Sequence, residues 1–151
     1  MNFEEFLVES IMHDLAGVVL IYNNKILLVR PKKFRKRMKK WSIPKGHIDV
    51  GMGKAETASH ELEEESRIKI KKKKLKAGEK GVLYYSKARA DKKLTYYVVK
   101  ITRDEMNVKL FNNMILGNFL KKETVEAGFF SKSDAEQIIE RPQLDLLKYL
   151  D

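Results

Sequence analysis

Residues 46–68 of the chain read GHIDVGMGKAETASHELEEESRI, and they contain the strongest structural signal in the sequence. A glycine-bearing loop opens this segment and directly follows WSIPK at residues 41–45. The second half of the segment has apolar residues at helical spacing, namely Ala55, Ala58 and Leu62. Because such residues share one stripe of a helix, the segment predicts a loop leading into a helix that is anchored to a core.

The predicted helix has a run of acidic residues, of which Glu61, Glu64 and Glu65 share one face. Positions i, i+3 and i+4 of a helix fall within an arc of roughly 100°, whereas Glu63 points well away from that arc. Hard cations such as Mg²⁺ prefer oxygen ligands of this kind. We therefore expect this face to hold a divalent cation. The alternative is that the glutamates form only a solvated helix surface.

The segment resembles the signature box of the Nudix hydrolases, which runs glycine, five residues, glutamate, seven residues, then Arg-Glu-apolar-any-Glu-Glu-any-Gly-apolar. The positions of this box that the chain fills are Gly46, Glu61, Leu62, Glu64, Glu65 and Ile68. The resemblance implies an α/β (α+β) fold, a Nudix-like α/β/α sandwich with a mixed central sheet. We expect it to form a single domain over residues 1–151.

The resemblance also implies which residues act at the site. Glu61 and Glu65 correspond to metal ligands, and Glu64 to a further ligand or the general base, so Glu64 and Glu61 are the candidate catalytic residues. The backbone carbonyl of Lys45, just before the box glycine, commonly joins the metal ligands in the family. Glu126 precedes an aromatic pair, as in a late Nudix strand, and is a further candidate metal ligand or substrate contact. The alternative for Glu126 is a surface charge at a strand end.

The implied reaction is hydrolysis of a phosphoanhydride bond with Mg²⁺ as cofactor, or Mn²⁺ in its place. The expected substrate is a nucleotide-type polyanion, a nucleoside diphosphate-linked compound such as a dinucleoside polyphosphate, ADP-ribose or the 5′-phosphorylated end of an RNA. Candidate substrate contacts are Arg30, Lys45 and Gly46. Bound cations would neutralise the charge that accumulates on phosphoryl oxygens and lower the pKa of a bound water.

Three positions depart from the box, where Met52 replaces the first glutamate, His60 the arginine and Arg67 the late glycine. Histidine reaches less far than arginine and is mostly neutral near pH 7, so a slower reaction is expected. If the position of Arg67 requires a positive φ, the arginine costs about 1 kcal/mol of stability. These departures leave a second hypothesis open, a catalytically impaired Nudix-like module that binds nucleotides or RNA.

The net charge of +10 on 151 residues favours anionic partners, although lysines also serve solubility. Seven of the ten residues 31–40 are cationic, which predicts either a phosphate-attracting lip or only a mobile surface loop. No apolar run approaches the ~20 residues that span a bilayer, so no membrane partner is expected. The absence of cysteine fits a reducing cytoplasm. The sequence does not define an oligomeric state.

The remaining segments predict strands and short helices around the box. Strands are expected at residues 15–22, 25–30, 41–44, 68–76, 81–88, 93–102 and 123–130, with a tight turn at Asn23 and Asn24. Helices are expected at residues 3–12, 135–139 and 143–150. Residues 103–121 are longer than a simple connection, and their sequence predicts no particular element.

Overall fold

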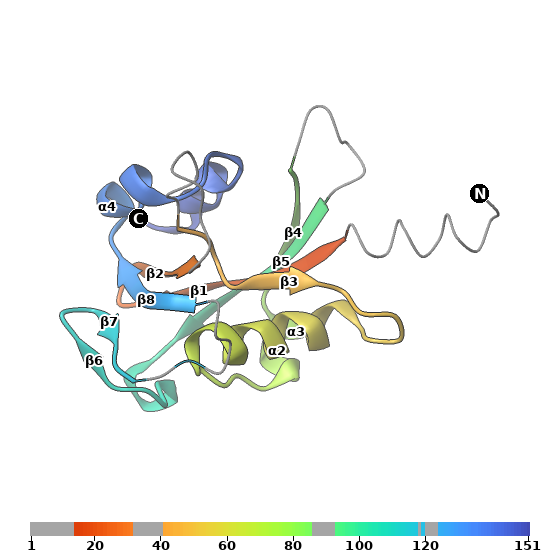
Figure 1. Ribbon diagram of the computed structural model, residues 1–151, viewed down its shortest axis with the longest axis horizontal. Helices are drawn as coiled ribbons and strands as arrows, with labels where there is room; N and C mark the ends of the chain where they lie inside the picture. The colour runs from red at the N-terminus through yellow and green to blue at the C-terminus, as the bar shows by residue number, and fades with distance from the viewer. Residues whose placement is uncertain (1–13, 32–40, 86–92, 118, 120–123) are drawn as a thin grey trace.

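The computed structural model describes residues 14–31, 41–85, 93–117, 119 and 124–151, and Figure 1 shows a sheet with helices on both of its faces. The strands are ordered β4-β5-β1-β2-β8-β7-β6, and β3 pairs with β1 outside this path. β1 and β5 are parallel, whereas the other strand pairs are antiparallel. This confirms the predicted α/β/α sandwich with a mixed central sheet.

The strands are β1 (Leu15–Tyr22), β2 (Lys25–Pro31), β3 (Lys45–His47), β4 (Glu79–Tyr84), β5 (Lys93–Ile101), β6 (Leu110–Phe111), β7 (Met114–Ile115) and β8 (Thr124–Phe130). The helices are α2 (Lys54–Ser66), α3 (Lys72–Ala77) and α4 (Lys132–Ile138), with 3-10 helices η2 (Arg103–Glu105) and η3 (Arg141–Tyr149). No helix among these described segments is long and apolar enough to cross a membrane.

The two faces of β1 support two separate cores, because successive side chains of a strand point to opposite sides. On one face, β1 and α2 share a core that includes Ala16, Val18, Leu20, Ala58 and Leu62. On the other face, β1 shares a core with α4 and η3 that includes Val19, Ile21, Ala135, Leu146 and Leu147. α2 is thereby fixed against the middle of the sheet, which positions its acidic residues.

Two Asn-Asn pairs turn the chain in tight hairpins. Asn23 and Asn24 have φ angles of 55° and 58° between β1 and β2, and Asn112 and Asn113 have 48° and 66° between β6 and β7. Asparagine is enriched at positive φ, and this conformation suits two-residue hairpin turns. The first hairpin confirms the prediction, and the second supplies structure within residues 103–121.

The strand predicted for residues 68–76 is wrong, because Lys72–Ala77 form α3 there. Ile68 and Leu75 are buried and Ile70 is half-buried, so the apolar residues do face the core. Lysine and alanine are good helix formers, and Ile68 and Ile70 lie in the segment before α3 begins at Lys72. The alternation of isoleucine and lysine that suggested a strand is therefore too short to set the conformation.

The strand predicted for residues 41–44 is replaced by two isolated bridges, from Ser42 to Val29 and from Trp41 to Ile139. The regular strand, β3, begins only at Lys45. Pro44 has no N–H to donate, which limits ladder formation before that point.

The other predicted elements appear with shifted ends. β4 and β5 form the expected antiparallel pair, and the helices predicted near the end of the chain are α4 and η3. The hydroxyl of Ser131 accepts a hydrogen bond from the N–H of Asp134 at 3.3 Å, which caps α4. The helix predicted for residues 3–12 and the basic run at 32–40 lie outside the described residues.

Candidate functional site

Glu65 is the acidic residue of α2 that is held most firmly, since only 8% of its surface is exposed. Its Oε2 accepts a hydrogen bond from the backbone N–H of Lys45 at 3.0 Å. This bond joins α2 to β3 and places a carboxylate beside the backbone that precedes Gly46. A buried carboxylate needs such a partner, because an unpaired buried charge is strongly unfavourable.

Glu61 lies one turn earlier and packs against the glycine of the box. A Cβ atom added to Gly46 would lie 2.2 Å from Cδ of Glu61 and 2.3 Å and 2.6 Å from its two oxygens. No side chain fits at residue 46 unless this carboxylate moves. The predicted glycine is therefore required by close approach to Glu61.

The antiparallel pairing of β1 and β3 determines which way the backbone carbonyl of Lys45 points. It points away from β1, as does the N–H of Lys45 that reaches Glu65. Val18 donates to the carbonyl of Pro44 and Ile48 donates to that of Asp14, both at 3.1 Å. Hydrogen-bonded positions alternate along an antiparallel pair, so Lys45 occupies a position that turns its polar groups away from β1. Its N–H reaches Glu65, and its carbonyl points to that same side.

Glu64 is oriented differently from the other two acidic residues. Its Oε1 lies 3.0 Å from Nε2 of His60, one turn earlier on the helix. Glu63 pairs with Lys69 at 3.6 Å, so it points away from the site as predicted. Within the described part of the chain, no three His, Cys, Asp or Glu side chains come together as a metal site. The Glu64 carboxylate lies against His60, and its role as a metal ligand or general base stays a prediction.

These donors fit a hard divalent cation. Glu61, Glu65 and the carbonyl of Lys45 supply only oxygen atoms, which is the donor set that Mg²⁺ and Mn²⁺ favour. Gly46 leaves room for the Glu61 carboxylate beside the β3 backbone. The arrangement can hold a cation with two carboxylates and a carbonyl, with Glu64 close by on the same helix.

A polar network fixes the segment that enters the site. Oε1 of the buried Gln143 accepts a hydrogen bond from the N–H of Ile43 at 2.9 Å. The side-chain NH₂ group of Gln143 donates to the hydroxyl of Tyr85 at 2.5 Å. Tyr85 in turn donates to Oε1 of Glu140 at 2.5 Å. The amino group of Lys45 lies 5.5 Å above the ring centre of Tyr85, a cation–π contact.

Burial raises the pKa of Tyr85, and the neighbouring carboxylates of Glu140 and Glu65 add to this shift. The phenol therefore stays neutral and remains a donor. Sequence reasoning missed Tyr85, Glu140 and Gln143, which lie far from the box in the chain. They have no local signal, because only the folded chain brings them to Ile43 and Lys45.

Two other predicted residues, Arg30 on β2 and Glu126 on β8, pair with each other. Their side chains are 3.2 Å apart, and the register of β2 and β8 places the two residues opposite one another. The guanidinium of Arg30 engages the Glu126 carboxylate. The two roles considered for Glu126, metal ligand and substrate contact, stay predictions. No acidic cluster forms around Glu126 within the described residues.

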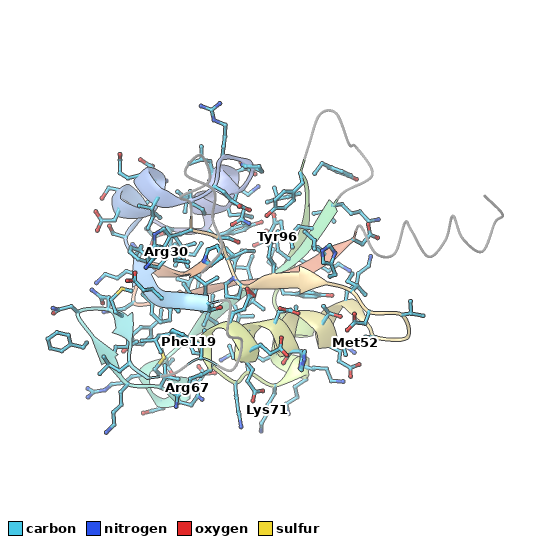
Figure 2. All side chains as sticks on the ribbon, in the orientation of Figure 1. Arg30, Met52, Arg67, Lys71, Tyr96 and Phe119 are labelled. Carbon is cyan, nitrogen blue, oxygen red and sulfur yellow. The ribbon has the colours of Figure 1, made fainter. Side chains whose placement is uncertain are left out.

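A cavity of about 500 Å³ lies next to this pair. Its walls are mainly apolar and aromatic, and they include Trp41, Ile115, Gly117, Phe119, Glu126 and Phe130. Trp41 packs edge-to-face on Phe130 with ring centres 4.9 Å apart. Trp41 thus contributes to both the core and the cavity. Figure 2 shows Phe119 near the end of α2 where Arg67 lies, and Met52 near its beginning.

Comparisons with known proteins identify the family and the fold of this chain. A family model described as "NUDIX domain" matches residues 12–147. An Ap4A hydrolase binary complex from C. elegans is 22% identical, with a TM-score of 0.64, over 89% of this chain and 93% of that one. A NUDIX hydrolase from Nitrosomonas europaea is 16% identical, with a TM-score of 0.60, over 90% of this chain and 85% of that one.

A third similar structure is a bifunctional NMN adenylyltransferase/ADP ribose pyrophosphatase from Francisella tularensis, complexed with AMP and a manganese ion. It is 17% identical, with a TM-score of 0.60, over 88% of this chain but only 39% of that one. These likenesses concern the fold. No curated protein sequence matches the chain.

Proposed function

The chain belongs to the Nudix hydrolase family, and from this premise we propose that it is a divalent-metal-dependent pyrophosphohydrolase of nucleoside diphosphate-linked compounds. The observation that carries the proposal is the contact of two carboxylates with one short strand. Glu65 accepts the N–H of Lys45, and Glu61 occupies the space beside Gly46. Such a site concentrates negative charge on oxygen atoms next to a backbone carbonyl.

Glu61, Glu65 and the carbonyl of Lys45 would hold a Mg²⁺ ion. Such a cation polarises phosphoryl oxygens and acidifies a bound water. Manganese in the Francisella structure supports Mn²⁺ as a substitute. The protein contributes a fixed position for these ligands, since the network around Gln143 holds the segment before Lys45.

Glu64 is the proposed general base. His60 holds its Oε1 at 3.0 Å, so the carboxylate has a defined orientation and its other oxygen can take the proton of an attacking water. The histidine stands where the family pattern has an arginine. It provides orientation through a hydrogen bond, with less charge than an arginine supplies.

Cationic side chains near the site are suited to phosphate groups. Arg30 and Lys45 are the proposed phosphate contacts, and Gly46 follows Lys45 within β3. The cavity beside Glu126 is suited to a flat, partly apolar group, because its walls include three aromatic rings. A nucleoside joined to a polyphosphate has both features. The similarity to an Ap4A hydrolase and an ADP ribose pyrophosphatase supports this class of substrate.

A substrate panel tests the proposal. Diadenosine tetraphosphate, ADP-ribose and 5′-triphosphorylated RNA are incubated with the protein in Mg²⁺, in Mn²⁺ and in EDTA. We expect cleavage of at least one compound with either metal and none in EDTA. Folded protein that cleaves none of the three, or that works equally well in EDTA, contradicts the proposal.

Binding without catalysis is the second candidate function. It is favoured by the exposed lysines of α3 and its N-terminal cap, Lys71, Lys72, Lys73 and Lys76, which give this helix an excess of positive charge. Under this alternative, RNA binding falls steeply with salt, needs no Mg²⁺ and persists in Glu64→Gln. Binding that is insensitive to salt rules it out.

A further inference from the structure

Arg67 adopts a backbone conformation that arginine rarely takes. It ends α2 in the left-handed region, with φ 68° and ψ 2°, and its N–H donates to the carbonyl of Glu63 at 2.8 Å. Asn107 supports this turn on both sides, since its amide donates to the carbonyl of Arg67 at 2.9 Å and its oxygen accepts from the N–H of Lys69 at 3.1 Å. A glycine would adopt this conformation at lower cost, so the backbone conformation alone does not account for an arginine at this position.

The side chain of Arg67 reaches across to a different part of the fold. Its Nη1 donates to the carbonyl of Leu116 at 3.1 Å. A Cβ atom added to Gly117 would lie 2.1 Å from that nitrogen, and Gly117 itself has a φ of 112°. The guanidinium therefore lies directly over the backbone of Gly117, which only a glycine permits.

The segment that Arg67 holds is a wall of the cavity. Ile115, Gly117 and Phe119 line the cavity, and Leu116 is tied to Lys109 by a backbone hydrogen bond of 3.1 Å. Figure 2 shows Arg67 and Phe119 at the same end of α2. Arg67 thus joins the helix that bears Glu61 and Glu65 to the wall that would contact the organic part of a substrate.

We propose that Arg67 is a positioning residue that sets the cavity wall against α2 and so determines affinity for the nucleoside part of the substrate. This inference rests on the proposed function, because it takes the cavity as the nucleoside site. A role in ending the helix alone would favour glycine at this position. A glycine at residue 67 could neither donate a hydrogen bond to the carbonyl of Leu116 nor fill the space over Gly117.

The experiment compares Arg67→Gly with Arg67→Lys, which keeps a long cationic donor. Lys69→Ala is the matched control, because it removes a cation two residues away that does not contact Leu116. The chain has a single tryptophan, Trp41, and it lines the cavity. Its fluorescence therefore reports binding of AMP without metal and without hydrolysis. kcat and KM are measured with whichever compound of the substrate panel is cleaved.

For Arg67→Gly we expect AMP affinity to fall about tenfold and KM to rise about tenfold, with kcat within about twofold and thermal stability equal or higher. Arg67→Lys recovers part of the loss, and Lys69→Ala matches the unaltered protein. Unchanged AMP affinity and KM in Arg67→Gly, or a loss confined to kcat, overturns the inference. So does an active protein whose tryptophan fluorescence does not respond to AMP. Failure of the proposed function is distinguishable, because then no panel compound is cleaved by the unaltered protein.

Discussion

The carboxylate of Glu61 occupies the space that a side chain on Gly46 would need, with the nearest contact at 2.2 Å. The glycine of the box and the first glutamate of the acidic run are thus one unit, although 14 residues lie between them in the sequence. The hydrogen bond between Lys45 and Glu65 places a second carboxylate beside the same backbone. The proposed cation site at this edge is based on these two contacts together.

Gly46→Ala tests the first contact. The added methyl group must displace the Glu61 carboxylate, so we expect the rate of hydrolysis to fall about 100-fold. Overpacking also lowers the free energy of unfolding by about 1–3 kcal/mol. Rates are measured at a temperature where urea unfolding shows both proteins to be folded. Gly53→Ala is the control, because nothing lies within 4 Å of a Cβ atom there. A Gly46→Ala protein with an unaltered rate contradicts the prediction.

Glu65→Gln tests the proposed metal ligand. Glutamine can still accept the N–H of Lys45, but it has no charge to hold a cation. In the unaltered protein, Mn²⁺ at 100 times its Kd is expected to add about 2.7 kcal/mol to the free energy of unfolding. Glu65→Gln should lose most of this gain, whereas Glu63→Gln, whose carboxylate pairs with Lys69, should keep it. Equal stabilisation of all three proteins by Mn²⁺ would show that Glu65 is not a ligand.

The contact between His60 and Glu64 predicts that the orientation of the Glu64 carboxylate affects the rate of hydrolysis. Without its partner at 3.0 Å, the Glu64 carboxylate is less well oriented, so His60→Ala should lower kcat about tenfold. His60→Arg introduces a permanently charged partner at the same position and should match or exceed the unaltered rate. Both are measured as kcat under saturating substrate. An alanine variant that is as fast as the unaltered protein contradicts the assigned role.

The neutral phenol of Tyr85 predicts a specific pH dependence of stability. Burial raises its pKa in the folded protein, so the stability it contributes is fully present below about pH 10 and declines above that value, where the unfolded chain ionises. Tyr85→Phe should be about 1–3 kcal/mol less stable near pH 7, because Glu140 and Gln143 lose a partner. The gap between the two proteins should narrow above about pH 10.

Urea unfolding of both proteins between about pH 7 and pH 11 measures this difference in the free energy of unfolding. Ionisation of the lysines affects both proteins equally, so it cancels when the two free energies are subtracted. Tyr84→Phe is the control, because Tyr84 is exposed on the neighbouring position. A gap that stays constant or widens above pH 10 contradicts the prediction.

The sequence predicts the helix register and the strand pair well, and the reasons are local. Helical spacing of alanine and leucine defines the buried stripe of α2, and the Asn-Asn turn defines the first hairpin. The α3 error also has a local cause, since two isoleucines alternating with lysines do not outweigh helix-forming residues. Secondary structure can therefore be predicted where the spacing of apolar residues or a turn motif is clear. It cannot be predicted in short segments that fit both a helix and a strand.

Tertiary relationships explain what the sequence does not predict. Arg30 and Glu126 were each proposed as site residues from the sequence, but their pairing depends on the register of β2 and β8. Gln143 reaches Ile43 across 100 residues of chain. The sequence shows that Arg67 replaces the glycine of the box, and this replacement predicts a loss of stability. The contact of Arg67 with Leu116 is visible only in the folded structure.

The most direct test of the proposed cation site compares two glutamates of α2, Glu61 and Glu63. The initial rate of Mg²⁺-dependent phosphoanhydride cleavage is measured for Glu61→Gln and for Glu63→Gln beside the unaltered protein. We expect a loss of at least about 100-fold for Glu61→Gln and a rate within about twofold for Glu63→Gln. Equal rates for the two variants would contradict a cation site at Glu61, Glu65 and Lys45.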